Sequence, residues 1–184
     1  TIREVNERVD RLASGLTGAG LAAGDRVLVM LGQHIDHVLT ILACFKTGIV
    51  SVPVNIHAKG DALEFLIAHA RPVAAIVDDE FRATALPLLE AQGIGRIVWR
   101  GADGPSTLAQ ASLAALAAAD IVRDRPSPGR DDILCLSYSS GTTGEPKGSL
   151  VTDLALRMSA HTCIHVGGMR RGDVMFLWEP LHHL

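Results

Sequence analysis

Residues 138–148 hold the densest set of chemically useful groups in the chain, Tyr-Ser-Ser-Gly-Thr-Thr-Gly-Glu-Pro-Lys-Gly. Gly141 and Gly144 allow positive φ angles and a close approach of the backbone to a ligand. The N–H groups exposed in such a turn form a concavity suited to anionic oxygens. Four hydroxyl side chains add small donors, and Lys147 adds a compact positive charge suited to a polyphosphate. The segment is therefore a candidate phosphate-binding turn.

The spacing in this segment excludes two common nucleotide-binding signatures. Counted from Gly141, Pro146 stands where a Walker A loop has its second glycine, and Gly148 follows the lysine in place of Ser or Thr. The dinucleotide fingerprint G-x-G-x-x-G is also absent from the segment. A polar surface loop between a strand and a helix remains open, because an arbitrary tract of Gly, Ser and Thr most often forms one.

Three other groups of polar residues have simpler explanations than a metal site. His161 and His165 are spaced by one helical turn, and so is the looser pair at 34 and 37, but the glutamate of H-E-x-x-H is missing. We therefore expect ordinary helix residues there. The acidic run at 78–80 is expected to be a strand-end turn that caps the next helix.

Apolar residues at helical spacing alternate with short apolar runs of strand length along the first hundred residues. The helical spacing predicts helices at 2–16, 34–47, 60–70 and 81–92. The apolar runs predict buried strands at 26–31, 49–54, 73–77 and 96–99. Buried strands separated by such helices indicate βαβ units with right-handed connections. We expect an α/β fold with a mostly parallel sheet flanked by helices.

The chain changes character after residue 100. The Ala-rich stretch 107–119 is expected to be a helix, and the turn-rich residues 125–129 a linker. Another buried strand is expected at 132–138, and a further one just before Pro180. The candidate phosphate-binding turn would then follow a strand directly.

Composition limits the classes of partner and location. A net charge of −3 argues against nucleic-acid binding. No apolar run reaches the roughly 18 residues of a membrane span, and no signal peptide is visible, so we expect a cytoplasmic protein. Cys44, Cys135 and Cys163 lie far apart in apolar surroundings, so we expect buried thiols in a reducing compartment.

The order of residues in the turn resembles a known signature. Ser-Ser-Gly-Thr-Thr-Gly-Glu-Pro-Lys-Gly is similar to the phosphate loop of the adenylate-forming superfamily, which includes acyl-CoA synthetases, nonribosomal-peptide adenylation domains and luciferases. The resemblance extends to Gly-Asp-Arg-Val at 24–27 and to residues 43–55, which match A-x-x-K-x-G-x-x-x-V-P-x-N. Residues 180–183, Pro-Leu-His-His, resemble the segment that leads into the acyl-pocket motif. Asp153 and His182 depart from the residues common in the family.

The resemblance implies an ATP-dependent carboxylate–CoA ligase. A carboxylate would attack the α-phosphate of ATP, and the thiol of CoA would then displace AMP from the acyl-adenylate. ATP, Mg²⁺, CoA and a small-molecule carboxylate are the implied ligands. Lys147 and His183 are the implied catalytic residues, with His183 near the carboxylate or acyl group. The implied pyrophosphate-binding residues are Ser139, Ser140, Gly141, Thr142, Thr143, Gly144 and Lys147.

The resemblance also implies that the chain is part of a large N-terminal AMP-binding domain. Residues 1–130 would form a first α/β subdomain, and 131–184 the phosphate loop and the start of the next. The C-terminal domain, the adenine contacts and the magnesium ligands would lie outside the chain, so we expect the 184 residues alone to be inactive. An adenylation domain that loads a carrier-protein thiol and a truncated, non-catalytic nucleotide-binding module are alternatives. The oligomeric state and the carboxylate cannot be predicted.

Overall fold

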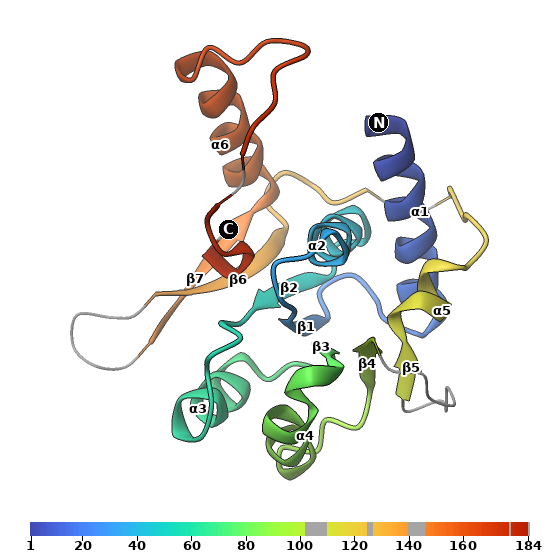
Figure 1. Ribbon diagram of the computed structural model, residues 1–184, viewed down its shortest axis with the longest axis vertical. Coiled ribbons are helices and arrows are strands. Elements are labelled where there is room, and N and C mark those ends of the chain that lie inside the picture. The colour runs from blue at the N-terminus through green and yellow to red at the C-terminus, as the bar shows by residue number, and fades with distance from the viewer. Residues whose placement is uncertain (102–109, 125–126, 140–145, 177, 184) are drawn as a thin grey trace.

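The computed structural model describes residues 1–101, 110–124, 127–139, 146–176 and 178–183. Seven strands form one sheet in the order β5-β4-β3-β1-β2-β6-β7 (Figure 1). The neighbouring strands are parallel except for β6 and β7, which are antiparallel. The strands are β1 (Arg26–Met30), β2 (Val50–Pro53), β3 (Ala74–Asp78), β4 (Ile97–Arg100), β5 (Gln110–Ser112), β6 (Ile133–Ser139) and β7 (Lys147–Thr152). The predicted α/β fold with a mostly parallel sheet is confirmed.

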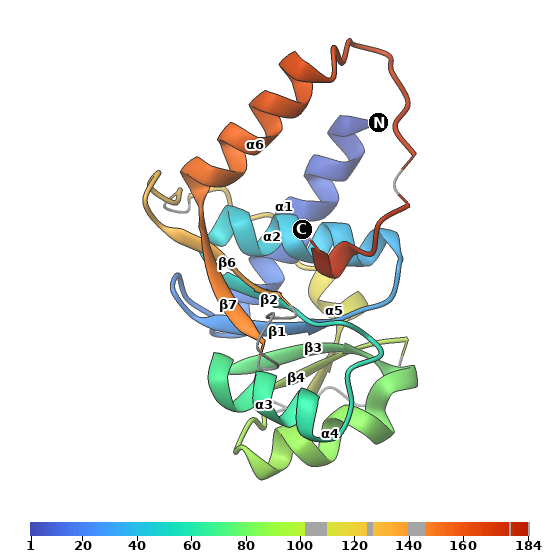
Figure 2. The same cartoon turned by 90° about the vertical axis from the view of Figure 1, so that its left-hand side faces the viewer.

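Helices cover both faces of the sheet. The α-helices are α1 (Ile2–Gly18), α2 (Ile35–Thr47), α3 (Asp61–Ala70), α4 (Arg82–Ala91), α5 (Leu113–Ala117) and α6 (Asp153–Val166). Two short 3₁₀ helices are η1 (Asp79–Phe81) and η2 (Leu181–His183). Figure 2 shows α1 and α2 on one side of the sheet, α3 and α4 on the other, and α6 extending away from it. In the part of the chain that the structure describes, no helix is both long and apolar enough to cross a membrane.

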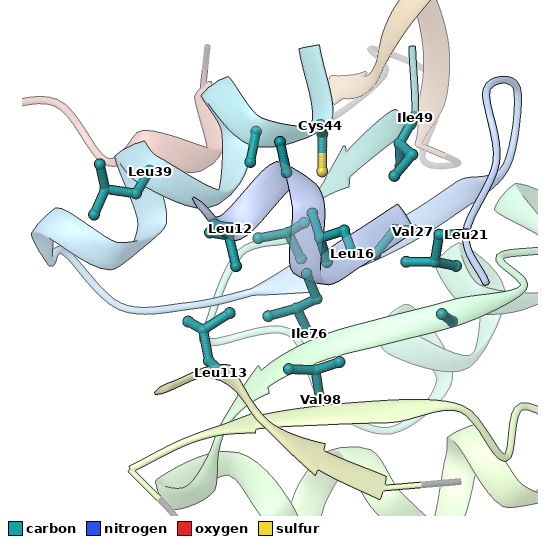
Figure 3. Close-up of a cluster of buried hydrophobic side chains, with 14 of the residues drawn as sticks. Leu12, Leu16, Leu21, Val27, Leu39, Cys44, Ile49, Ile76, Val98 and Leu113 are labelled. Carbon is teal, nitrogen blue, oxygen red and sulfur yellow. The ribbon is translucent and has the colours of Figure 1, made fainter. Parts of the chain in front are cut away.

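The alternation of side chains along the central strands builds two cores. Val27 and Val29 of β1 face α1 and α2, where they pack with Leu12, Leu16 and other buried residues (Figure 3). Leu28 and Met30 face the opposite side and pack against α3 and α4. Successive side chains of a strand point to opposite faces, so a strand buried on both sides becomes a continuous apolar run. This is why the apolar runs located the strands.

The helix boundaries follow from local capping. The imidazole of His34 accepts a hydrogen bond from the Asp36 N–H and caps α2, which ends at Gly48 with φ of 71°. Glycine adopts this left-handed conformation without the clash that a Cβ would cause. The Thr152 hydroxyl caps α6 by accepting from the Ala155 N–H. The predicted helices and strands of the first hundred residues are confirmed to within two residues at each end.

The predicted helix over 107–119 is confirmed only in part, at Leu113–Ala117. Gln110–Ser112 form β5, which pairs with β4, and the helix covers only Leu113–Ala117. The Ser112 hydroxyl accepts from the Ala115 N–H and starts α5 at residue 113. Pairing with an existing sheet therefore outweighs the helix propensity of alanine at the start of this stretch. Residues 107–109 lie outside the described residues.

Two further predictions need correction. The strand expected before Pro180 is wrong, because residues 173–176 belong to no helix or strand. Cys44 and Cys135 are buried as expected, but Cys163 on α6 is exposed. An apolar sequence context buries a residue only where a neighbouring element covers that side of the helix. Few elements pack against α6 and the two residues that follow it, and most of residues 154–168 are exposed.

Candidate functional site

The predicted phosphate-binding turn lies between β6 and β7. Ser139 ends β6, Lys147 begins β7, and the two are direct partners across the antiparallel pair. Both residues are exposed. Ser140, Gly141, Thr142, Thr143 and Gly144, also predicted to bind phosphate, lie outside the described residues. The hairpin thus brings a hydroxyl-bearing residue and a lysine opposite one another at the base of the turn.

The next pair of residues in the hairpin, away from the turn, is Tyr138 and Gly148. Tyr138 lies opposite Gly148, where an added Cβ would come within 3.0 Å of Leu136 Cδ1. The Tyr138 hydroxyl lies 2.6 Å from Nδ1 of His69, a residue of α3. Burial raises the pKa of Tyr138, so its hydroxyl stays protonated at neutral pH and can share a hydrogen bond with the imidazole. This contact ties the hairpin to a helix on the α3 side of the sheet.

The topology places Ser139 and Lys147, which flank the turn, at the carboxyl edge of the sheet, the edge at which its parallel strands end. Strands β1, β2 and β6 are parallel, and β6 pairs with β2 through Cys135 opposite Ser51. The carboxyl ends of the three strands therefore emerge at one edge, where α/β proteins most often bind ligands. Gly32 follows β1 there, Asn55 follows β2, and Ser139 ends β6.

The predicted acyl-site histidine lies at this edge too. His183 is exposed on η2, which contacts β2. It borders a cavity of about 320 Å³. The lining comes from the segments after β1 and β2 and from the end of the chain, and includes Gly32, Gln33, Asn55, His57, His182 and His183. The structure thus brings Ser139, Lys147 and His183 to one edge of the sheet, although they lie far apart in the sequence.

Histidines dominate the polar chemistry around this cavity. Burial lowers the pKa of His182, and the neighbouring His183, His37 and His57 lower it further. Burial also lowers the pKa of His37, which is almost fully enclosed. Its Nδ1 lies 3.2 Å from the Gly32 carbonyl oxygen. Both imidazoles are consequently neutral at neutral pH, so neither supplies a positive charge there.

Helix α6 carries His161 and His165, which the sequence predicts to be ordinary helix residues. The rings of His161 and His165 lie 4.0 Å apart, centroid to centroid, and both residues are exposed. Over the described ranges, no group of three or more His, Cys, Asp or Glu side chains is arranged to hold a metal ion.

Sequence reasoning missed Gln33 and His57 as residues of this edge. Neither belongs to a motif, and each is the second or a later residue after a strand. The signal that could have found them is positional, because residues that follow adjacent parallel strands meet at one edge of the sheet. Applying it requires the order of the strands, which the sequence does not reveal.

Comparison with known proteins identifies the family. The model of the AMP-binding enzyme family matches residues 1–184. The chain belongs to the AMP-binding enzyme family. The adenylate-forming resemblance seen in the turn is thereby confirmed for the whole chain.

The relatives of this AMP-binding chain include several acid–CoA ligases. It is 29% identical to a long-chain-fatty-acid–CoA ligase of Mycobacterium tuberculosis, covering 100% of this chain and 36% of that protein. It is 32% identical to a feruloyl-CoA synthase of an Amycolatopsis species, covering 100% of this chain and 34% of that protein. The chain thus spans about a third of the length of these relatives.

Solved structures share the fold of this AMP-binding chain. The crystal structure of an anthranilate–CoA ligase in complex with anthranoyl-AMP superimposes with a TM-score of 0.76 at 27% identity. The match covers 90% of this chain and 32% of the ligase.

Proposed function

We propose that the protein containing this chain activates a carboxylate with ATP and transfers the acyl group to coenzyme A. A carboxylate oxygen attacks the α-phosphorus of ATP, the bond to the bridging oxygen breaks, and pyrophosphate leaves with its electron pair. The thiol sulfur of CoA then attacks the acyl carbon, and AMP leaves. The thiol proton passes to solvent.

The observation that carries this proposal is the pairing of Ser139 with Lys147 at the base of the glycine-rich turn. The first half-reaction concentrates negative charge on the departing pyrophosphate. A fixed lysine and aligned hydroxyl and N–H donors stabilise such charge as it develops. Because Lys147 starts a strand that is paired along its length, its backbone is held in place before any ligand arrives.

His183 supports the other half of the proposal. It borders a cavity at the same edge of the sheet as Ser139 and Lys147. We assign it to the carboxylate or acyl group, which must lie beside the α-phosphate for the first bond to form. The anthranoyl-AMP held by a ligase of the same fold supports an acyl-adenylate as the intermediate.

Magnesium usually accompanies ATP and would neutralise part of the phosphate charge. The described residues offer no cluster of three or more ligating side chains for it. Lys147 and the hydroxyl and N–H donors of the turn are the chain's own contribution to phosphate binding in this proposal.

The test is carboxylate-dependent ATP–pyrophosphate exchange in the longest natural protein that contains this sequence. Lys147→Ala removes the positive charge and is expected to lower the exchange rate about 10²–10³-fold, the usual cost of losing one such donor. Lys147→Arg keeps the charge and should lose less. The 184-residue chain alone is expected to give no exchange.

Arg3→Ala serves as the matched control, because it removes one exposed positive charge from α1. It should leave the exchange rate unchanged. Equal rates for Lys147→Ala and Arg3→Ala would contradict the assignment of the turn. Acyl transfer to free CoA would support the ligase, whereas transfer only to a carrier-protein thiol would show that the second half-reaction has a different acceptor.

A further inference from the structure

The side-chain amide of Gln33 bridges two distant parts of the chain. Its Nε2 donates to the backbone carbonyl oxygen of Glu179 at 2.9 Å, and its Oε1 accepts from the backbone N–H of Leu181 at 3.1 Å. A primary amide offers donors on its nitrogen and an acceptor on its oxygen. Gln33 therefore makes with residues 179 and 181 the pair of bonds that a neighbouring strand would make.

The bridged segment is the one that carries His183. Leu181 is only 4% exposed, and the His183 N–H donates to the Pro180 carbonyl oxygen at 3.0 Å to close the turn. The two bonds from Gln33 hold the residues just before this turn and its first residue. They fix where the turn begins and how it faces the cavity that His183 borders.

The backbone next to Gln33 is fixed by a buried carboxylate. The N–H of the preceding residue, Gly32, donates to the buried carboxylate of Asp78 at 2.7 Å. The backbone at the end of β1 is therefore fixed from β3, while the side chain of Gln33 reaches outward. Because Gln33 is exposed, its loss should disturb the turn locally and leave the two cores intact.

We propose that Gln33 is a positioning residue that sets the orientation of the His183 turn for carboxylate binding. This inference rests on the proposed function, since it takes His183 to face the carboxylate or acyl group. Gln33 does not touch the reacting atoms in this account. It acts only through the backbone of residues 179–181.

The experiment uses Gln33→Glu and Gln33→Met in the longest natural protein that contains this sequence. Glutamate keeps the shape but lacks the donor for the Glu179 carbonyl, and methionine has similar length but lacks both groups. We expect the KM for the carboxylate to rise about tenfold, the scale of one or two lost hydrogen bonds. The KM for ATP and the thermal midpoint should stay as in the wild type. Hydrogen exchange in peptides that contain Leu181 should become faster.

Gln92→Glu is the matched control. Gln92 is an exposed glutamine that follows α4, so the same chemical change is made on the far side of the sheet. It should change neither the KM for the carboxylate nor the exchange at Leu181.

The outcomes separate this inference from the proposed function. The positioning role is overturned if both Gln33 variants keep the wild-type KM for the carboxylate and the wild-type rate of hydrogen exchange at Leu181. This holds even if Lys147→Ala abolishes ATP–pyrophosphate exchange. A parallel rise in the KM for ATP, or a lowered thermal midpoint, would also overturn it, because that pattern indicates general damage to the fold. If Lys147→Ala instead keeps the full rate of ATP–pyrophosphate exchange, the proposed function fails, whatever the rate of hydrogen exchange at Leu181.

Discussion

Asp78 joins three elements at the carboxyl edge of the sheet, and removing its side chain is the sharpest test of how that edge is held. The residue ends β3 and is only 2% exposed. Its Oδ2 accepts from the Gly32 N–H at 2.7 Å, and its Oδ1 accepts from Nη1 of Arg100 at 2.8 Å. Arg100 also donates from Nε to the Asp36 carboxylate at 2.9 Å. Burial lowers the pKa of Arg100, but the bonds to the two carboxylates outweigh it and raise the pKa overall.

The expected cost of Asp78→Ala follows from these two contacts. Losing the charge-assisted bond to the Gly32 N–H costs about 1.5–3 kcal/mol. The second contact counts for less, about 0.5–1 kcal/mol, because the Arg100 side chain is 25% exposed and keeps Asp36 as a partner. A total of about 2–4 kcal/mol corresponds to a thermal midpoint lowered by about 4–16 °C in a chain of this size.

The assay is thermal and urea unfolding of the 184-residue chain, followed by tryptophan fluorescence. Trp99 is 3% exposed in the folded chain and moves into water on unfolding, whereas Trp178 is already 73% exposed and should change little. Asp79→Ala is the control, since the neighbouring carboxylate pairs with Arg82 while both side chains stay about 40% exposed. Such an exposed pair contributes about 0–1 kcal/mol. If both substitutions lower the midpoint equally, the reasoning from burial is refuted.

Two further predictions concern a helix contact and a buried imidazole. Gly15→Ala should lower the free energy of unfolding by about 1–3 kcal/mol, because its Cβ would lie 2.2 Å from the backbone oxygen of Leu116. Gly18→Ala, where nothing lies within 4 Å, should leave stability unchanged or slightly higher in the same urea titration, and equal losses would refute the contact. The pKa of His37 is lowered by burial below its ordinary value of 6.5, so the unfolded chain binds more protons as the pH falls through that value. Stability is then full above pH 6.5 and declines below it. His37→Asn, which cannot titrate, should flatten part of this decline between pH 7 and pH 5, and an unchanged slope would contradict the assignment.

Local patterns in the sequence were sufficient for most secondary structure. The helices at α1–α4 follow from apolar spacing, and Gly48 ends α2 where expected. The strands at β1 to β4 follow from apolar runs, because a parallel sheet buries both faces of each strand. Lys147 and its glycine-rich neighbours were singled out because the order of their residues resembles the phosphate loop of the adenylate-forming superfamily.

The errors arose where contacts distant in sequence decide the outcome. Gln110–Ser112 have the composition of a helix start, yet they form a strand because they can pair with the side of β4 that β3 leaves unpaired. Cys163 has apolar neighbours in sequence, yet it is exposed because little packs against that side of α6. Neither the unpaired side of β4 nor the uncovered side of α6 can be predicted from local spacing.

The sequence by itself determined the class of fold, the family and the candidate phosphate-binding residues, because these depend on periodicity and residue order over short distances. Tertiary structure alone decided that β6 lies beside β2, and so that Ser139, Lys147 and His183 share one edge of the sheet. It also decided the contact of Gln33 with Glu179 and Leu181, which lie 146 and 148 residues away. Strand order depends on which faces the crossover helices bury, and that packing involves the whole chain at once.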